Sequence, residues 1–575
     1  MNSSTRFPFC TTTMLCLLVL TVDAQTQVTV NNGVLEGVRR TVEGLTWDVF
    51  YGIPYAKPPV GNLRFAKPEP AENWTGVRNA SWFGSGCVQE KSPYVKLIVP
   101  LSEDCLTLNV YLPGMLDNST KKAVMYFIHG GSYYYGGSFS YTFDELALRG
   151  DVIVVSVNYR LGVFGFLYSG DANAPGNVGL WDQIEGLKWV RDNIAHFGGD
   201  PNQVTIFGES AGASSVTQLA LTTASSGLFS RVIVQSGTLL STWAWSITPT
   251  VLAEAVATNL GCSSTSASLA LCTQNKTATE ILDAGAAAVG EAKGSFGPVV
   301  DGDMFTKPAR EILNDSSSKA FTQFQSLDFM AGFLDGDGTA MLTNNVENGL
   351  SLEFLERAIL FTAFLISTPH AEALEEKIKE VYYDTTASNI DTAKSYLDLL
   401  TDTNFASGTV ELSNNHMSSN ASTYLWYMTV KPDFSHIIPA PTWFDGASHA
   451  DDLGYLQGEY ILGLITPGGI ATTADKALSV NVIRYWTNFA KTGNPNSPDL
   501  VQWPGYTKDG KAYLELSRNI AAKNDVLSKR MALWQVTVPG ILSGEISSAS
   551  YTHNYLWSRA LLTMFFGYMT SLIFS

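Results

Sequence analysis

The sequence predicts an α/β protein with a mostly parallel central sheet that is flanked by helices. Apolar runs of strand length lie at residues 124–128, 152–157 and 232–236, as expected for strands that are covered on both faces. Residues 180–197 have apolar side chains at helical spacing, and residues 211–221 are small and apolar. Because these two kinds of segment alternate along the chain, a parallel sheet with helices on its faces is favoured.

A single large domain is expected over residues 25–540. The chain has 575 residues, of which 45% are hydrophobic, so it can bury a large core. It has no repeat of 20 to 50 residues and no long Pro- or Ser-rich linker. Residues 250–290 and 350–405 are helix-rich, and we expect these insertions to surround an active-site gorge above the strand ends.

The charge of the chain argues against nucleic acid as a partner. The net charge is −17 and the isoelectric point is about 4.9, whereas phosphate binding needs basic patches. A negative field can concentrate cationic substrates, although acidic surfaces more often serve solubility. No motif for a cofactor or a metal stands out, so the expected partner is a small molecule.

The N-terminus predicts export. Arg6 precedes the apolar run 14–21, and small residues at 22–24 offer a cleavage point, which is typical of a secretory signal over residues 1–24. The chain after this signal keeps an even number of cysteines, which allow three pairings in an oxidising compartment. The local pairs Cys87–Cys105 and Cys262–Cys272 close short loops and are preferred. A zinc site is the alternative, but no Cys-x-x-Cys or paired histidine spacing supports it.

Two further patterns suit a protein of the secretory pathway, either secreted or anchored at the cell surface. Sequons for N-glycosylation lie in polar surroundings at Asn73, Asn79, Asn118, Asn275, Asn314 and Asn420. Residues 541–575 contain small residues, a polar spacer and an uncharged apolar end at 560–575, the pattern of a GPI-anchor signal. A marginal tail anchor and an amphipathic association helix are the alternatives. Membrane contact is expected only through this tail.

Ser210 is the first candidate for chemistry. It lies in Gly208-Glu209-Ser210-Ala211-Gly212, between the strand-like residues 204–207 and the helix-like residues 211–221. A serine on such a sharp turn exposes its hydroxyl, and the flanking glycines avoid clashes with the neighbouring backbone. The helix that follows directs its free N–H groups towards developing negative charge. This pattern predicts a nucleophile that attacks an ester carbonyl.

Acyl transfer by a serine also needs oxyanion donors and a histidine held by a carboxylate. His129-Gly130-Gly131-Ser132 follows a strand, so the backbone N–H groups of Gly131, Ser132 and Ala211 can share one target. Of the seven histidines, His449 lies in a late loop, 444–453, that suits a catalytic base. Asp337, in the turn Asp335-Gly336-Asp337-Gly338, is the candidate acid, and Asp335 is its competitor. The chain order serine, acid, histidine is the one expected for this serine turn.

These motifs and several others together resemble the type-B carboxylesterase/lipase family, which includes cholinesterases and carboxylesterases. The resemblance covers nearly all of residues 25–538. The stretches that carry it are 50–56, 58–65, 102–113, 157–162, 176–183, 197–203, 208–212, 235–237 and 298–302.

The resemblance implies an α/β-hydrolase fold, hydrolysis of carboxylic esters and the two local disulfides. It aligns the family's acidic turn with Gly336-Asp337-Gly338, which makes Asp337 the triad acid where many members have Glu. It also implies that Glu209, Gly130, Trp243 and Phe296 line the substrate pocket.

The sequence departs from the family pattern in further places. No Trp lies between Cys87 and Cys105, where cholinesterases hold the choline cation; Tyr94 is the only aromatic there. Residues 292–296 are mostly small where cholinesterases have bulky aromatics, which implies room for a larger acyl group. Ser132 replaces the third glycine of the oxyanion turn.

The expected activity is therefore that of a broad carboxylesterase, and a homodimer is compatible with the resemblance. A cholinesterase with an atypical choline site is the alternative within the same chemistry. A non-catalytic adhesion protein of the neuroligin type is the alternative from another class, although the catalytic residues that such relatives tend to lose are present here.

Overall fold

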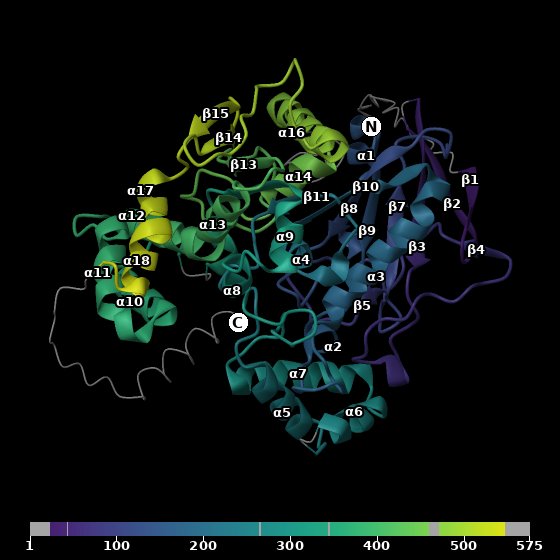
Figure 1. The fold of residues 1–575 in the computed structure, drawn as a ribbon, viewed down its shortest axis with the longest axis horizontal. Coiled ribbons are helices and arrows are strands. Elements are labelled where there is room, and N and C mark those ends of the chain that lie inside the picture. Colours follow the sequence, from purple (N-terminus) through teal and green to yellow (C-terminus); the bar gives the residue numbers. More distant parts are fainter. Residues whose placement is uncertain (1–23, 43, 264–265, 343–345, 459–470, 547–575) are drawn as a thin grey trace, which may run out of the picture.

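The computed structural model describes residues 24–42, 44–263, 266–342, 346–458 and 471–546 (Figure 1). Its strands are β1 (Ala24–Val30), β2 (Gly33–Val42), β3 (Leu45–Pro54), β4 (Val77–Asn79), β5 (Gly86–Cys87), β6 (Leu101–Ser102), β7 (Thr107–Tyr111), β8 (Lys122–Ile128), β9 (Ile153–Val157), β10 (Gly199–Glu209), β11 (Arg231–Gln235), β12 (Asp328–Leu334), β13 (Thr423–Met428), β14 (Ala512–Leu516) and β15 (Ala521–Asn524). All except β5 and β6 form one sheet.

The helices fall into two groups. Those of the first half are α1 (Asp144–Gly150), α2 (Gly162–Phe166), α3 (Val178–Asn193), α4 (Ala211–Ala220), α5 (Pro249–Asn259), α6 (Ser266–Gln274) and α7 (Ala278–Ala292). Those of the second half are α8 (Ala309–Leu313), α9 (Lys319–Gln325), α10 (Leu352–Ile366), α11 (Ala371–Tyr382), α12 (Asn389–Thr401), α13 (Ser407–His416), α14 (Asp451–Gln457), α16 (Thr473–Thr492), α17 (Ser528–Ala532) and α18 (Val538–Ser543). Short π-helices follow α12 at Asp402–Ala406 and α17 at Leu533–Thr537.

The centre of the main sheet is parallel, as predicted. The strands follow the order β1-β2-β3-β7-β9-β8-β10-β11-β12-β13-β14-β15, and every pair from β9 to β14 is parallel. Towards the two edges the pairs are antiparallel, except that the short strand β4 pairs with β2 in parallel. The predicted strands at 124–128, 152–157 and 232–236 are β8, β9 and β11. Together with the flanking helices this confirms the α/β-hydrolase architecture.

Both faces of the sheet are buried, which explains why the central strands are apolar throughout. On β8, Val124, Tyr126 and Ile128 face the cluster that contains residues of α3 and α4. The alternate residues Met125 and Phe127 face a second cluster formed with α1, α14 and α16. Figure 1 shows α16 and α14 on one side of the strands and α3 and α4 on the other. Because strand residues alternate between faces, each strand contributes to two cores.

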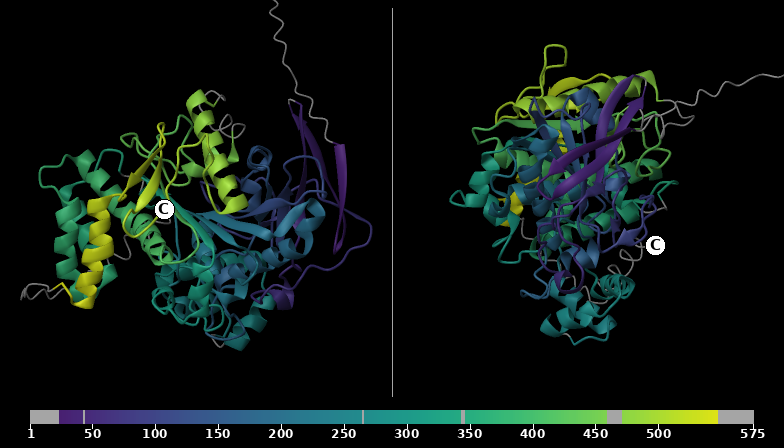
Figure 2. Two further views of the ribbon diagram at one scale, coloured as in Figure 1. Left: turned by 45° about the horizontal axis from the view of Figure 1, so that its top comes forward. Right: turned by 90° about the vertical axis from the view of Figure 1, so that its right-hand side faces the viewer.

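The predicted helical insertions are present at the periphery. Helices α5, α6 and α7 lie together beyond α2 at one end of the molecule (Figure 1). Helices α10 and α11 contribute to a third apolar cluster with α17 and α18, at the side of the sheet (Figure 2). Both local disulfides form, so the cysteines do not bind zinc. Their presence is consistent with the secretory pathway.

Other expectations concern the ends and the surface of the chain. The signal at 1–24 and the tail at 560–575 lie outside the described residues, apart from Ala24, which begins β1. Within the described ranges, no helix combines the length and apolarity that a membrane span requires. The asparagines of all the predicted sequons are exposed; Asn79 lies in β4 rather than in a loop.

Candidate active site

Ser210 occupies a strained turn at the carboxyl end of β10, directly before α4. Its φ is 58° and its ψ is −123°, an unfavourable conformation for a residue with a side chain. A Cβ atom on Gly208 would lie 2.6 Å from Ile128 O, and one on Gly212 would lie 2.0 Å from the same atom. Both glycines are therefore needed for the close packing of this turn on β8. Ser210 remains partly accessible.

The glycine turn after β8 lies against Ser210. A Cβ atom on Gly130 would lie 3.0 Å from Ser210 Cβ and 2.8 Å from Glu209 Oε2. Gly131 has a φ of 105°, and a Cβ atom there would lie 1.9 Å from Tyr135 O. Ser132 is exposed and adopts a φ of 55°, in the left-handed region. A glycine would suit that conformation better, and Ser132 tolerates it at some cost.

The glycine turn and the N-terminus of α4 both adjoin Ser210. Ala211 is the first residue of α4, and the first N–H groups of a helix have no partner within the helix. His129 helps to hold the glycine turn in place: its Nδ1 lies 2.7 Å from Gly130 O, and its carbonyl accepts a hydrogen bond from Tyr159 Oη. Burial lowers the pKa of His129 to about 4, so this histidine is neutral. Its role in the turn is structural.

His449 lies between two acidic residues, Asp337 and Glu209. Its Nδ1 lies 2.8 Å from Asp337 Oδ1, at the carboxyl end of β12. Its Nε2 lies 3.0 Å from Oε1 of Glu209, the residue before Ser210. That contact has ion-pair distance but not the geometry of a hydrogen bond, because Glu209 Oε1 has no hydrogen-bond partner among the described residues. Within the same residues, no hydrogen bond links His449 to the Ser210 hydroxyl.

Asp335, the competitor for the acid, has a different partner. Its Oδ1 accepts a hydrogen bond from the backbone N–H of Ala447, at 2.8 Å. Asp337 Oδ2 accepts one from the backbone N–H of Leu334. The two acidic residues of this turn therefore have different partners: Asp337 contacts the His449 imidazole, and Asp335 holds the loop that carries it.

The loop of His449 is fixed by a side chain at each of three successive backbone N–H groups. Besides the Ala447 N–H on Asp335, the Ser448 N–H donates to Asp451 Oδ2 at 2.8 Å. The His449 N–H donates to Thr339 Oγ1 at 3.1 Å. A parallel bridge between Gly336 and Ser448 adds a backbone link. The acid turn and the histidine loop therefore form one hydrogen-bonded unit.

The site contains several buried ionisable side chains. Burial lowers the pKa of His449, but the attraction of Glu209 and the contacts with Asp337 outweigh it and raise that pKa to about 10. Burial raises the pKa of Glu209, and His449 opposes this effect. Burial and the nearby Glu209 raise the pKa of Asp452 to about 8. Asp452 accepts a hydrogen bond from Gln235 Nε2, while its Oδ1 has no partner within the described ranges.

Aromatic side chains cover the imidazole. The ring of Phe405 lies 4.9 Å from that of His449, and the ring of Trp243 lies 5.8 Å from Phe405. A Cβ atom on Gly237 would lie 3.0 Å from the Trp243 ring and 2.5 Å from Ser210 O. The predicted pocket residue Trp243 therefore borders the nucleophile turn.

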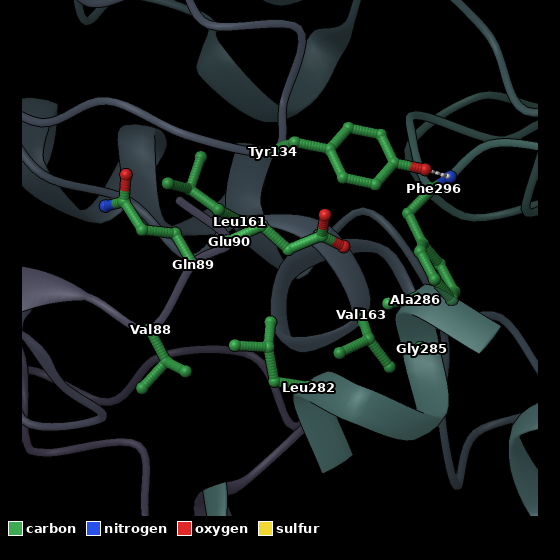
Figure 3. Close-up of a pocket in the computed structure, with 11 residues that line it drawn as sticks. Val88, Gln89, Glu90, Tyr134, Leu161, Val163, Leu282, Gly285, Ala286 and Phe296 are labelled. Atoms are coloured by element: carbon green, nitrogen blue, oxygen red, sulfur yellow. Dashed lines mark hydrogen bonds between the residues drawn. The ribbon is translucent and has the colours of Figure 1, made fainter. Parts of the chain in front are cut away.

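Phe296 lies elsewhere. Its backbone N–H donates to Tyr134 Oη, and its buried ring lines a small pocket with Tyr134, Val163 and Leu282 (Figure 3). None of the residues that line this pocket belongs to the serine turn, the acid turn or the histidine loop. A role for Phe296 in the substrate pocket stays a prediction.

Several residues of the site were not predicted from the sequence. Phe405, Thr339 and Asp452 carry no local motif, and neither does His436, whose Nδ1 lies 2.6 Å from Asp451 Oδ2. The adjacent acidic residues Asp451 and Asp452, shortly after His449, are the one sequence feature that could have indicated further acidic residues near the site. The described residues contain no group of three or more His, Cys, Asp and Glu side chains that could hold a metal ion.

Comparison with known proteins agrees with this architecture. The sequence model of the carboxylesterase family matches residues 24–534. The medium-chain fatty acyl-CoA hydrolase precursor of Anas platyrhynchos is 32% identical over 90% of this chain and 93% of its own length. Liver carboxylesterase 1 of Oryctolagus cuniculus is 34% identical over 84% of this chain and 88% of its own. Neuroligin-2 of Mus musculus is also 34% identical, over 85% of this chain but 64% of the neuroligin. Because the family model spans every strand of the sheet and these relatives align with at least 84% of the chain, the chain belongs to the carboxylesterase family.

Proposed function

We propose that this protein is a serine carboxylesterase that cleaves esters through an acyl-enzyme on Ser210. The observation that carries the proposal is the position of His449, which contacts Asp337 with one ring nitrogen and reaches the Ser210 turn with the other. Membership of the carboxylesterase family supports a carboxylic ester hydrolase, and the named hydrolases among its relatives agree.

In the proposed mechanism, His449 accepts the Ser210 proton as the hydroxyl oxygen attacks the ester carbonyl. Asp337 orients the imidazole through Nδ1 and stabilises its charged form. The N–H groups of Gly131, Ser132 and Ala211 bind the oxyanion. His449 then donates its proton to the leaving alcohol, and a water molecule repeats the sequence on the acyl-enzyme.

Glu209 adds a constraint to this mechanism. A protonated His449 cannot accept the serine proton, and Glu209 favours the protonated form. The reactive form is therefore the neutral imidazole with Nε2 turned from Glu209 Oε1 towards Ser210. Both targets adjoin Gly130, where an added Cβ atom would lie 2.8 Å from Glu209 Oε2 and 3.0 Å from Ser210 Cβ. Catalytic contacts often tighten only when substrate is bound.

The proposal includes the cellular setting. The disulfides and the exposed sequon asparagines support a secreted or surface-anchored glycoprotein, with residues 1–24 as signal and the apolar end at 560–575 as anchor signal. Mass spectrometry of the mature protein tests this point: it should begin near Gln25 and lack the apolar end.

The decisive test of the enzyme is the Ser210→Ala variant. A fluorophosphonate probe should label the wild type at Ser210 and leave the variant unlabelled. Hydrolysis of nitrophenyl esters should fall by roughly 10⁴- to 10⁶-fold in the variant. Ser543→Ala, on the exposed side of α18, is the control and should behave as the wild type. Normal turnover by Ser210→Ala, or a wild type that is neither labelled nor active, would refute the proposal.

A graded set of esters then defines the substrate. Acyl chains of increasing length, together with acetylthiocholine, separate a broad carboxylesterase from a cholinesterase. The loop between Cys87 and Cys105 contains no Trp to hold a quaternary ammonium group, so we expect poor turnover of the choline ester.

A further inference from the structure

Two adjacent glycines follow the oxyanion turn. Gly136 and Gly137 belong to no helix or strand and precede the short 3₁₀ helix at Ser138–Ser140. The φ of Gly136 is 111°, a value that favours glycine. Because glycine restricts its own backbone so little, contacts from elsewhere must fix the peptide groups on either side of Gly136.

The side chain of Gln89 makes those contacts. Its Oε1 accepts a hydrogen bond from the Gly136 N–H at 2.8 Å, and its Nε2 donates to Gly136 O at 2.8 Å and to Cys87 O at 3.0 Å. Gln89 is only 3% exposed, so water does not compete for these bonds. Figure 3 shows its amide directed away from the pocket that Glu90 enters. One amide group therefore holds both peptide groups that flank Gly136.

The peptide groups that Gln89 holds pack against the oxyanion turn. The Gly136 N–H and the Tyr135 carbonyl belong to one planar peptide group and point in opposite directions. A Cβ atom on Gly131 would lie 1.9 Å from Tyr135 O. A Cβ atom on Gly136 would lie 2.8 Å from His129 Nδ1 and 2.9 Å from Gly130 O. Rotation of the peptide group between residues 135 and 136 would therefore move its oxygen relative to Gly131.

We propose that Gln89 is a positioning residue for ester hydrolysis. It acts through Gly136 and the Tyr135 carbonyl, and it keeps the Gly131 N–H directed at the oxyanion. Such donors stabilise the transition state only when they are oriented in advance, which the glycines of this segment do not achieve alone. The inference rests on the proposed function and adds a residue from outside the catalytic turns.

The test uses two substitutions of Gln89 and one control, all in the full-length protein. Gln89→Met keeps a side chain of similar length but removes every hydrogen bond. Gln89→Glu introduces a buried carboxyl group, which in its protonated form can accept from the Gly136 N–H and donate to Gly136 O. The control is Gln323→Met on α9, because Gln323 also donates to a backbone carbonyl, that of Thr222, at 2.9 Å.

Gln89→Met should lose roughly 10- to 100-fold in kcat on a soluble nitrophenyl ester, with little change in KM. A trifluoromethyl ketone gives a second measurement, because Ser210 adds to its carbonyl carbon and the carbonyl oxygen takes the negative charge. The affinity for this ketone should weaken by about the same factor as kcat/KM. Gln323→Met should retain the kcat and the ketone affinity of the wild type.

Gln89→Glu provides a readout that a general loss of stability would not change. Burial favours the protonated carboxyl group, so the kcat of this variant relative to the wild type should be highest near about pH 6. The ratio should fall towards about pH 9, where the carboxyl group ionises and no longer donates to Gly136 O. Titration of His449 and Glu90 cancels in the ratio, because both enzymes contain these residues.

Two outcomes would overturn the inference. One is a Gln89→Met variant with the kcat and ketone affinity of the wild type, and the other is a Gln89→Glu ratio that does not depend on pH. The second measurement remains decisive if Gln89→Met does not fold. A wild type that is inactive on soluble esters would instead refute the proposed function.

Discussion

Nε2 of His449 lies 3.0 Å from Oε1 of Glu209, the residue immediately before Ser210. The imidazole is thus held between two carboxylates, because its Nδ1 contacts Asp337. In the proposed mechanism Asp337 orients the base, while Glu209 favours the protonated form of His449.

The first prediction concerns Glu209→Gln. Burial lowers the pKa of His449 in the folded protein, but the charge of Glu209 and the contact with Asp337 raise it to about 10. Removing that charge lowers the pKa, so the limb of kcat/KM that rises with pH should move to lower pH. A pH profile on a soluble ester measures this shift. Glu353→Gln, whose side chain is 72% exposed in α10, is the control and should leave the limb in place. An unmoved limb in Glu209→Gln would show that Glu209 does not control the base.

Asp335 gives one prediction about the position of the His449 loop and a second one about how stability depends on pH. Burial raises its pKa to about 8, so at neutral pH it is a neutral acid that accepts the Ala447 N–H. Asp335→Asn keeps an acceptor oxygen and should retain activity, whereas Asp335→Ala should lose roughly 10- to 100-fold by misplacing the His449 loop. Equal activity of the two variants would contradict the positioning role.

The stability of the same variants should depend on pH with a defined sign. Between the unfolded pKa of Asp335, near 3.8, and the folded value of about 8, only the native state keeps the proton. Native stability therefore falls with rising pH across this window, through this group. Asp335→Asn lacks the effect, so its melting temperature relative to the wild type should increase from pH 4 to pH 8. A constant difference would show that the folded pKa is not raised.

Thr339 is predicted to stabilise the catalytic loop through its hydroxyl. Its Oγ1 accepts the His449 N–H and lies 2.8 Å from Ser448 Oγ. Thr339→Val keeps the shape but leaves a buried N–H unpaired, which should lower the free energy of unfolding by about 1–3 kcal/mol. Thr339→Ser keeps the hydroxyl and should be less affected. Chemical denaturation with a fluorescence readout gives both values; equal losses would assign the effect to the methyl group instead.

Gly131→Ala should damage the oxyanion turn. The added Cβ would lie 1.9 Å from Tyr135 O, so the backbone must move and its N–H groups lose their common target. Loss of such a donor costs about 10²- to 10³-fold in kcat. Gly76→Ala is a matched control, because Gly76 also has a positive φ, 76°, but nothing lies within 4 Å of its Cβ position. If both variants lose activity equally, general backbone strain is the cause.

Local patterns in the sequence predicted the elements and much of the site. The apolar runs gave β8, β9 and β11 because both faces of those strands are buried, and Gly-x-Ser-x-Gly gave the turn between β10 and α4. The short cysteine loops predicted both disulfides. The strand and serine-turn signals each lie within a few consecutive residues, and the cysteine pairs are only 18 and 10 positions apart, so no knowledge of tertiary contacts was required.

The contacts that the sequence did not predict join distant segments. The bond between Asp335 and Ala447 spans 112 positions, and the bond between Thr339 and His449 spans 110. Phe405 contacts the His449 imidazole from a short π-helix that no sequence motif predicts. Such pairings depend on how β12 and the histidine loop meet in space, which a single sequence does not encode in any local pattern.

The bridge from Gly336 to Ser448 and the side chains that hold residues 447–449 have a mechanical consequence. Because these contacts link the segments that carry Asp337 and His449, we expect a displacement of one to move the other with it, relative to the Ser210 turn at the end of β10. The distance that decides whether the proposed reaction can begin is then the one between the His449 imidazole and the Ser210 hydroxyl. We therefore expect a ligand or a substitution that changes turnover without contacting the ester to do so by changing this distance.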